Sequence, residues 1–190
     1  MSKTPFLTLE QAQNIIKDVP TPFHVYDEKA IRQNLRNINK AFAWNKGFKE
    51  YFAVKALPNP SILNILKEEG CGVDCSSYTE LLLSEAVGFS GSDIMFSSNV
   101  TPEQDMKKAY ELGAYINLDA STHVDFLEQV AGVPESMFCR FNPGGVFTLS
   151  ESKEGFQVMD KPGDAKYGMT EAQLKASFCK LAEKGSKHLA

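Results

Sequence analysis

The chain has 190 residues, of which 43% are hydrophobic and 23% are charged, and its formal net charge is −4. This composition is typical of a globular protein and excludes the collagen-like and intrinsically disordered classes. The 20 basic and 24 acidic residues form no long run of one sign, so we expect no nucleic-acid partner.

The sequence contains neither a membrane-spanning segment nor a secretory signal. No apolar stretch approaches the ~18 residues that a spanning helix requires, and residues 1–13 lack the continuous apolar core of a signal peptide. We therefore expect a cytoplasmic protein with no membrane partner.

The cysteines and histidines predict neither disulfides nor a metal site. Cys71, Cys75, Cys139 and Cys179 form no paired C-x-x-C motif and no compact disulfide framework. Reduced and mostly buried thiols are the expected state. The three histidines are far apart in the sequence, which argues against a histidine-based metal site.

The N-terminal part of the chain precedes a repeating pattern. A proline-containing turn leads into a predicted short strand over residues 23–26, and an amphipathic helix is expected over residues 28–43. We assign residues 1–45 to a strand and helix that lead into the main domain, and residues 46–190 to that domain.

Apolar and aromatic runs then recur about every 22 residues and are predicted to be strands. They cover residues 50–54, 72–75, 93–96, 114–118 and 137–141. Start signals for helices follow: Asn59 with Pro60, Ser77 with Glu80, Thr101 with Pro102 and Gln104, and Thr170 with Gln173. A strand, a loop, a helix and a second loop bring the chain back to a parallel neighbour. Five such units predict a parallel α/β architecture.

Polar residues follow each predicted strand. They are Lys55, Asp74, Ser77, Ser97, Asn99, Asn117, Asp119, Arg140 and Asn142. In a (β/α)₈ barrel these positions converge on the rim at the carboxyl ends of the strands, where such folds carry their chemistry. The alternative is an open doubly wound sheet, which would favour a glycine-rich phosphate-binding fingerprint that the chain lacks. The pattern favours the barrel, with a long rim loop over residues 142–168.

Lys55 directly follows a run that is expected to be buried. An amine at the end of a core strand is partly desolvated, which lowers its pKa and makes it a nucleophile toward a carbonyl. Pyridoxal phosphate is a cofactor that supplies an aldehyde. Asp74 could stabilise the lysine charge, or it could be a strand-end carboxylate that faces water. Arg140 could bind a cofactor oxygen or a substrate carboxylate, or form a structural ion pair.

Four ordered motifs carry a family resemblance. They are TPFHVYD over residues 21–27, YFAVKA over 51–56, GVD over 72–74 with Ser77 and Glu80 beyond it, and CRFNPG over 139–144. Together they closely resemble the fold-type III pyridoxal-phosphate decarboxylases of the alanine racemase-like barrel class. Within that class the motifs resemble those of the diaminopimelate decarboxylases.

The resemblance implies roles for individual residues. Lys55 matches the lysine that forms a Schiff base with pyridoxal phosphate, Asp74 the acidic residue near it, and Arg140 the arginine that faces the cofactor. Ser77 and Glu80 match an S-x-x-E element, although a capping box would explain both. The chain departs from the family pattern at Leu57, where asparagine is usual.

The implied function is the decarboxylation of meso-diaminopimelate to lysine, with an amino acid as the substrate and a homodimer as the form of full-length relatives. Three alternatives stay open. The first is a decarboxylase of ornithine, arginine or carboxynorspermidine, and the second is a non-catalytic pyridoxal-phosphate-binding or regulatory homologue. The third is an open-sheet binding module without this cofactor.

The length predicts an incomplete barrel. A (β/α)₈ barrel typically needs ~200 to 250 residues, whereas this chain has five units, a helix over residues 171–184 and the start of a sixth strand at residues 187–190. The later strands, the phosphate-binding glycine loop and the C-terminal β-domain of the family have no counterpart. We therefore expect an N-terminal part of such an enzyme that is inactive alone.

Overall fold

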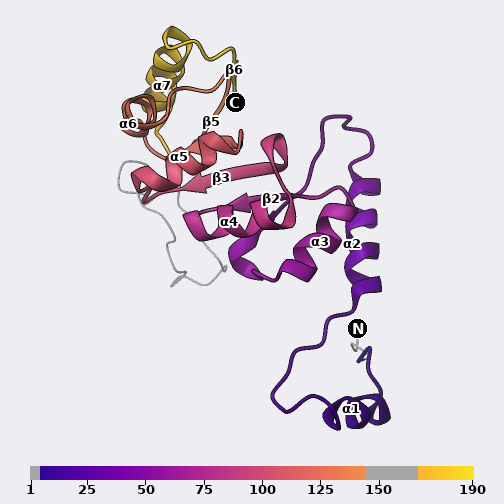
Figure 1. Ribbon diagram of the computed structural model, residues 1–190. Helices are drawn as coiled ribbons and strands as arrows, with labels where there is room; N and C mark the ends of the chain where they lie inside the picture. The colour runs from indigo at the N-terminus through magenta and orange to yellow at the C-terminus, as the bar shows by residue number, and fades with distance from the viewer. Residues whose placement is uncertain (1–4, 144–166) are drawn as a thin grey trace, which may run out of the picture.

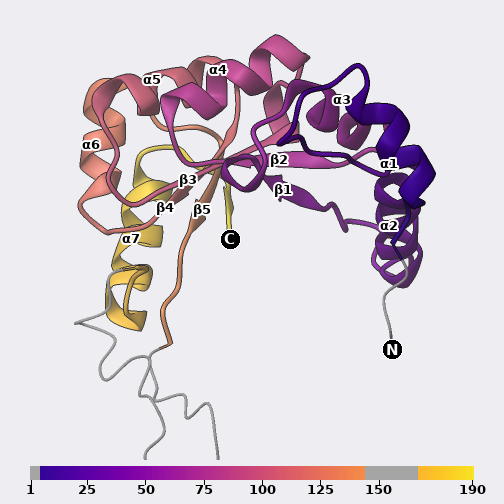
Figure 2. The ribbon, with the colours of Figure 1, turned by 90° about the horizontal axis from the view of Figure 1, so that it is seen from below.

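Parallel strands form one curved sheet, and helices cover its outer face (Figures 1 and 2). The computed structural model describes residues 5–143 and 167–190. The strands are β1 (Tyr51–Ala53), β2 (Gly72–Cys75), β3 (Ile94–Ser98), β4 (Tyr115–Leu118), β5 (Ser136–Cys139) and β6 (His188–Leu189). The α-helices are α1 (Leu9–Ile16), α2 (Glu28–Ala41), α3 (Pro60–Glu68), α4 (Tyr78–Val87), α5 (Glu103–Glu111), α6 (His123–Val130) and α7 (Glu171–Glu183). The short 3₁₀ helices are η1 (Val54–Ala56) and η2 (Gly91–Asp93).

The order of the strands in the sheet is their order in the sequence, from β1 to β6, and all pairs are parallel. A doubly wound sheet reverses its strand order at a switch point and carries helices on both faces. Here the order does not reverse, and Figure 2 shows α3 to α7 outside an arch whose inner side is the sheet. The predicted α/β barrel class is therefore confirmed over the described residues.

Alternation along the strands explains the two faces of the sheet. Val73 and Cys75 of β2 are fully buried, and Ile94 and Phe96 of β3 are at most 2% exposed. Asp74, between the first two, is only half-buried. Because successive side chains of a strand point to opposite faces, the buried set packs under the helices and the other set lines the concave face.

Two helix starts agree with the sequence. The side chain of Asn59 accepts hydrogen bonds from the backbone N–H groups of Ser61 and Ile62, and Pro60 is the first residue of α3. At α7, Thr170 and Gln173 form the reciprocal capping box that was expected. These caps satisfy N–H groups that have no partner within the helix.

One other predicted helix start is confirmed in part, and one was wrong. The Ser77 hydroxyl caps α4 by accepting from the backbone N–H of Glu80, as expected, but the carboxylate of Glu80 accepts from the backbone N–H of Ser76 instead of that of Ser77, so α4 has no reciprocal box. At α5 the N-cap residue is Pro102, because the Thr101 hydroxyl donates to the carbonyl oxygen of Ser98 at the end of β3. The Glu80 carboxylate and the Thr101 hydroxyl each stabilise the turn that precedes the helix.

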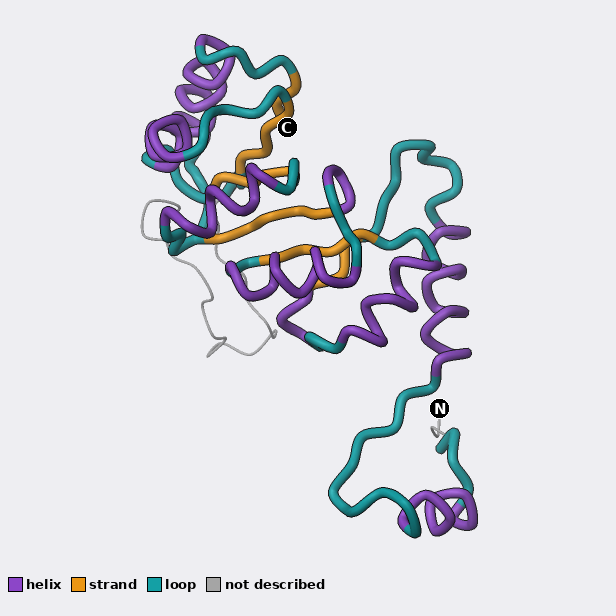
Figure 3. Tube along the Cα trace, in the orientation of Figure 1, coloured by secondary structure: helices purple, strands orange, loops and turns teal. Residues whose placement is uncertain are grey.

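The predicted strand over residues 23–26 was also wrong. Figure 3 draws the whole segment between α1 and α2 as a loop, with no described strand beside it to accept its hydrogen bonds. A strand exists only through such pairing. Helix α1 has no buried residue and lies away from the sheet in Figure 1. The domain boundary near residue 45 stays a prediction.

The predicted strand ends and the predicted rim loop agree only in part with the structure. The sixth strand is present as β6, whereas β1 ends at Ala53 and β5 at Cys139, earlier than predicted. Of the expected rim loop, residues 144–166 lie outside the described part of the chain.

Three of the four free cysteines are buried and Cys179 is exposed. Burial raises the pKa of the Cys75 thiol to about 12. None of the helices in the described ranges is long and apolar enough to cross a membrane.

Gly72 is required where β1 and β2 meet. A Cβ atom there would lie 2.6 Å from Cδ1 of Tyr51 and 2.8 Å from the backbone oxygen of Asp93. Backbone cannot move aside as a flexible side chain can, so Gly72→Ala is expected to lower the free energy of unfolding by about 1–3 kcal/mol. Urea denaturation measures the change. Gly47→Ala is the control, since its Cβ would have its nearest neighbour at 3.7 Å, and an equal loss in both variants would contradict the prediction.

Candidate active site

A cavity of about 400 Å³ lies on the concave face of the sheet. It is lined by Tyr51, Asp74, Met95, Ser97, Asn117, Phe138, Cys139, Arg140 and Ala190. Most of these residues alternate with those that are buried under the helices. Arg140 and Cys139 lie at the carboxyl end of β5, and the carboxyl ends of the strands are where α/β barrels place their reactive groups.

Lys55 follows β1 as the middle residue of η1. Its neighbour Val54 is fully buried, but Lys55 itself is exposed and does not line the cavity. The expectation of a desolvated lysine was therefore wrong. The 3₁₀ turn explains this, because it takes the chain out of the strand before the lysine is reached. The positive charge of Lys55 nevertheless acts on Asp74.

Asp74 lies in β2, where it pairs in register with Ala53 of β1 and Met95 of β3. Its Oδ1 atom is buried and has no hydrogen-bond partner among the described residues. Burial raises the pKa of the carboxyl group, and the opposing influences of Ser97, Lys55 and Arg140 are smaller. Asp74 thus presents an unpartnered acceptor near the lysine.

The raised pKa of Asp74 predicts a pH effect on stability. Below the pKa of an unfolded aspartate, near 3.9, the carboxyl is protonated in both the folded and the unfolded chain. As the pH rises through the higher pKa of the folded state, ionisation favours the unfolded chain and stability is lost. Asp74→Asn removes this loss, so its free energy of unfolding should exceed that of the wild type at pH 7 but not at pH 3.5. Urea titrations at both values measure it, and a larger gain at the lower pH would contradict it.

Arg140 directly follows β5 and lines the cavity. Its Nη1 atom donates to Oδ1 of Asp119 at 3.1 Å, and its guanidinium carbon lies 4.7 Å from the centre of the Tyr167 ring. The structural ion pair that the sequence left open is therefore present. The binding of a cofactor oxygen or a substrate carboxylate by Arg140 stays a prediction.

Ser77 and Glu80 have a structural explanation. The Glu80 carboxylate accepts hydrogen bonds from Ser76 and from the Ser77 hydroxyl, at 2.9–3.0 Å. These bonds fix the turn between β2 and α4. Neither residue lines the cavity beside Asp74.

Sequence reasoning missed the partners of Arg140. Asp119 was noted only as a polar residue after a strand, and Tyr167 was not singled out. The adjacency of β4 and β5 could have predicted the contact with Asp119, because the two residues occupy equivalent positions after neighbouring strands. No local signal indicates Tyr167. A further polar contact on this face joins Nδ2 of Asn117 to the Ser97 hydroxyl at 3.3 Å.

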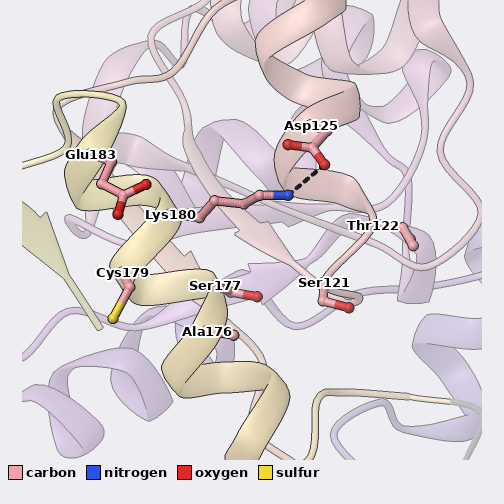
Figure 4. A pocket seen from close by; sticks show the side chains of 8 residues that line it. All are labelled: Ser121, Thr122, Asp125, Ala176, Ser177, Cys179, Lys180 and Glu183. Carbon is pink, nitrogen blue, oxygen red and sulfur yellow. Dashed lines mark hydrogen bonds and ion pairs between the residues drawn. The ribbon is translucent and has the colours of Figure 1, made fainter.

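A second cavity, of about 470 Å³, lies between α6 and α7 in the helical layer (Figure 4). Asp125 and Lys180 face each other across it, with 2.6 Å between the carboxylate oxygen and Nζ. Cys179 points away from this pair in the same view. Asp125 and Lys180 satisfy each other there, and Glu183 adds a second carboxylate to the lining. The cavity on the concave face, which contains the polar residues predicted after the strands, is therefore the candidate site.

Comparisons with known proteins agree on a family. Residues 28–188 match the family model described as "Pyridoxal-dependent decarboxylase, pyridoxal binding domain". Protein TabA of Pseudomonas amygdali pv. tabaci is 42% identical over 168 residues, which cover 88% of this chain and 38% of TabA. A diaminopimelate decarboxylase of Bacteroides thetaiotaomicron is 28% identical over 156 residues, covering 76% of this chain and 40% of that protein.

A solved structure shows the same fold. The diaminopimelate decarboxylase of Helicobacter pylori, crystallised in complex with L-lysine, matches 94% of this chain and 44% of its own, with a TM-score of 0.72 and 26% identity. The chain spans about two fifths of the length of these relatives. Because the family model covers most of the sequence and the sheet has the corresponding topology, the chain belongs to the pyridoxal-dependent decarboxylases and matches the model of their pyridoxal-binding domain over residues 28–188.

Proposed function

We propose that Lys55 binds the aldehyde carbon of pyridoxal phosphate, and that this chain is the cofactor-binding part of an enzyme that decarboxylates meso-diaminopimelate to lysine. One observation carries the proposal. In a chain that matches the pyridoxal-binding family, Lys55 follows β1, whose Ala53 pairs in register with Asp74, and the buried Oδ1 atom of Asp74 has no hydrogen-bond partner among the described residues. The substrate is supported by the named function of the relatives from Bacteroides and Helicobacter.

The side chains present fit the cofactor. Asp74 leaves one buried oxygen without a donor among the described residues, and a cationic or N–H-bearing group in the cavity would satisfy it. Arg140 brings a guanidinium to the same cavity, and this group suits an anionic oxygen. Lys55 would supply the amine, Asp74 the acceptor and Arg140 the donor.

Pyridoxal phosphate, when bound, supplies the electron-withdrawing ring that makes decarboxylation of an amino acid possible. The protein must hold the reacting groups and limit the access of water. Phe138 and Met95 provide apolar walls in the cavity, and Tyr115 packs against Phe138 with 5.1 Å between ring centres. Burial raises the pKa of Asp74, and a cationic or N–H-bearing group of the cofactor at its inner carboxyl oxygen would favour the ionised form.

A second candidate is a non-catalytic pyridoxal-phosphate-binding homologue. The observation that favours it is the exposure of Lys55, which does not line the cavity on the concave face. A lysine that is open to solvent would give water access to the reacting groups. Ornithine, arginine or carboxynorspermidine as the substrate, a homodimeric assembly and a cytoplasmic location remain predictions from the sequence.

Covalent trapping tests the cofactor site. The purified chain is mixed with pyridoxal phosphate, reduced with borohydride, digested and analysed by mass spectrometry. We expect the modified residue to be Lys55, because its amine is exposed and pairs with no carboxylate of the described residues, whereas Lys180 and Lys108 are held in ion pairs. Modification spread evenly over the surface lysines would overturn the proposal.

Carbon dioxide release by the chain would exclude the second candidate. We expect the 190-residue chain alone to release none from meso-diaminopimelate, because the concave face is uncovered in the described structure. Release of carbon dioxide with formation of lysine would exclude the non-catalytic homologue. It would also show that the open face is no obstacle to turnover.

A further inference from the structure

Asp119 and Arg140 are brought together by the register of two neighbouring strands. Leu118 of β4 pairs with Cys139 of β5, and the backbone N–H of Arg140 donates to the carbonyl oxygen of Leu118 at 2.9 Å. The residues that follow each strand therefore start from adjacent positions on the rim. Backbone pairing, and not a flexible loop, determines that the carboxylate meets the guanidinium.

The two partners differ in exposure. The side chain of Asp119 is 9% exposed, whereas that of Arg140 is 48% exposed. A nearly buried carboxylate is costly unless a charge or a donor pairs with it, and Nη1 of Arg140 is the hydrogen-bond donor that the described residues supply. The pair is therefore anchored at the aspartate, and the arginine extends from it.

The arginine is held on two sides and open on a third. Asp119 binds Nη1, and the ring of Tyr167 lies against the guanidinium plane at 4.7 Å. Nε and Nη2 of Arg140 have no hydrogen-bond partner in residues 5–143 and 167–190. Since Arg140 lines the cavity on the concave face, these donors are available to a ligand there.

We infer that Asp119 is a positioning residue, which together with the Tyr167 ring orients Arg140 to bind an anionic oxygen of the cofactor in the cavity. The inference rests on the proposed function, because it takes pyridoxal phosphate to be the ligand. It adds a residue that touches no ligand and acts through Arg140. A guanidinium that is already held in place loses less conformational entropy when it binds a ligand than a freely rotating one. A variant in which Arg140 is no longer held should therefore bind the cofactor more weakly.

The test is the dissociation constant of pyridoxal phosphate, measured by fluorescence titration of the full chain. Asp119→Asn keeps the shape of the side chain and removes its charge, and we expect the dissociation constant to rise about tenfold, which corresponds to 1.4 kcal/mol. Asp125→Asn is the matched control. It removes the carboxylate from the exposed Asp125–Lys180 pair in the helical layer (Figure 4) and should leave the constant unchanged.

A double-mutant cycle distinguishes positioning from general destabilisation. In the Arg140→Ala background, Asp119→Asn should change the dissociation constant by less than about twofold, because the arginine on which it acts is gone. Should Asp119→Asn fail to fold, Asp119→Glu takes its place. It keeps the paired charge but displaces it by one methylene, so a smaller rise is expected.

The outcomes separate this inference from the proposed function. No binding and no trapping at Lys55 in the wild-type chain would overturn both. Wild-type binding with an unchanged constant in Asp119→Asn, or with equal losses in the wild-type and Arg140→Ala backgrounds, would overturn only the role of Asp119. Repeating the titrations with pyridoxal, which lacks the phosphate, identifies the oxygen that Arg140 binds. If Asp119→Asn still raises the dissociation constant tenfold, Arg140 lies at the phenolic oxygen. If the rise disappears, Arg140 lies at the phosphate.

Discussion

Replacing Lys55 with arginine is expected to abolish the trapping of pyridoxal phosphate by borohydride. A guanidinium stays protonated at any pH that a protein tolerates and cannot act as the nucleophile toward an aldehyde, although it keeps the positive charge. The charge that acts on Asp74 is thereby retained while the amine is lost. The measurement is the mass of the intact reduced chain and of its peptides.

Lys49→Arg is the matched control, because Lys49 and Lys55 stand on either side of β1. Lys49 forms an ion pair with Asp93 that arginine can also form. This control should trap as much cofactor as the wild type. Undiminished trapping in Lys55→Arg, or equal losses in both variants, would show that the lysine after β1 is not the attachment point.

Phe96→Ala is expected to cause the largest loss of stability. Phe96 lies in β3, opposite Cys75 of β2 and Ile116 of β4, and is 2% exposed beneath the helices. Removing a fully buried phenyl ring loses its transfer free energy and leaves a cavity, at a cost of about 3–5 kcal/mol. Domains of this kind are typically stable by about 5–15 kcal/mol, so the variant should be close to unfolding.

Urea denaturation with circular dichroism measures this effect as a lower midpoint at an unchanged slope. Trp44→Ala is the control. Trp44 is an aromatic residue of larger size but is 79% exposed, so its removal should cost about 0.5 kcal/mol or less. A loss in Trp44→Ala as large as in Phe96→Ala would show that the core does not lie between the sheet and the helices.

Features that depend on local patterns could be predicted from the sequence. The strands were located by their apolar runs, and the starts of α3 and α7 by the caps Asn59 and Thr170. The parallel, sequential sheet followed from the spacing of strands and helices, because short connections through a helix leave few topologies. The same logic placed Asp74 and Arg140 on one face, where both line the cavity.

Features that depend on tertiary partners could not be predicted in this way. Residues 23–26 have the composition of a strand but no described neighbour with which to pair. Lys55 follows an apolar run, yet the turn of η1 leaves it exposed. The hydroxyl of Thr101 could cap α5 or bond back to Ser98, and only the folded backbone decides between them. Tyr167 reaches Arg140 across 27 positions of sequence.

The most direct test of the proposed site is a crystal structure of the chain after reaction with pyridoxal phosphate and borohydride. We predict continuous electron density from Nζ of Lys55 to the cofactor, with the ring over the concave face, a donor near Oδ1 of Asp74 and an anionic oxygen at Arg140. Density for the cofactor on another lysine, or in the cavity between α6 and α7, would contradict the assignment of this site.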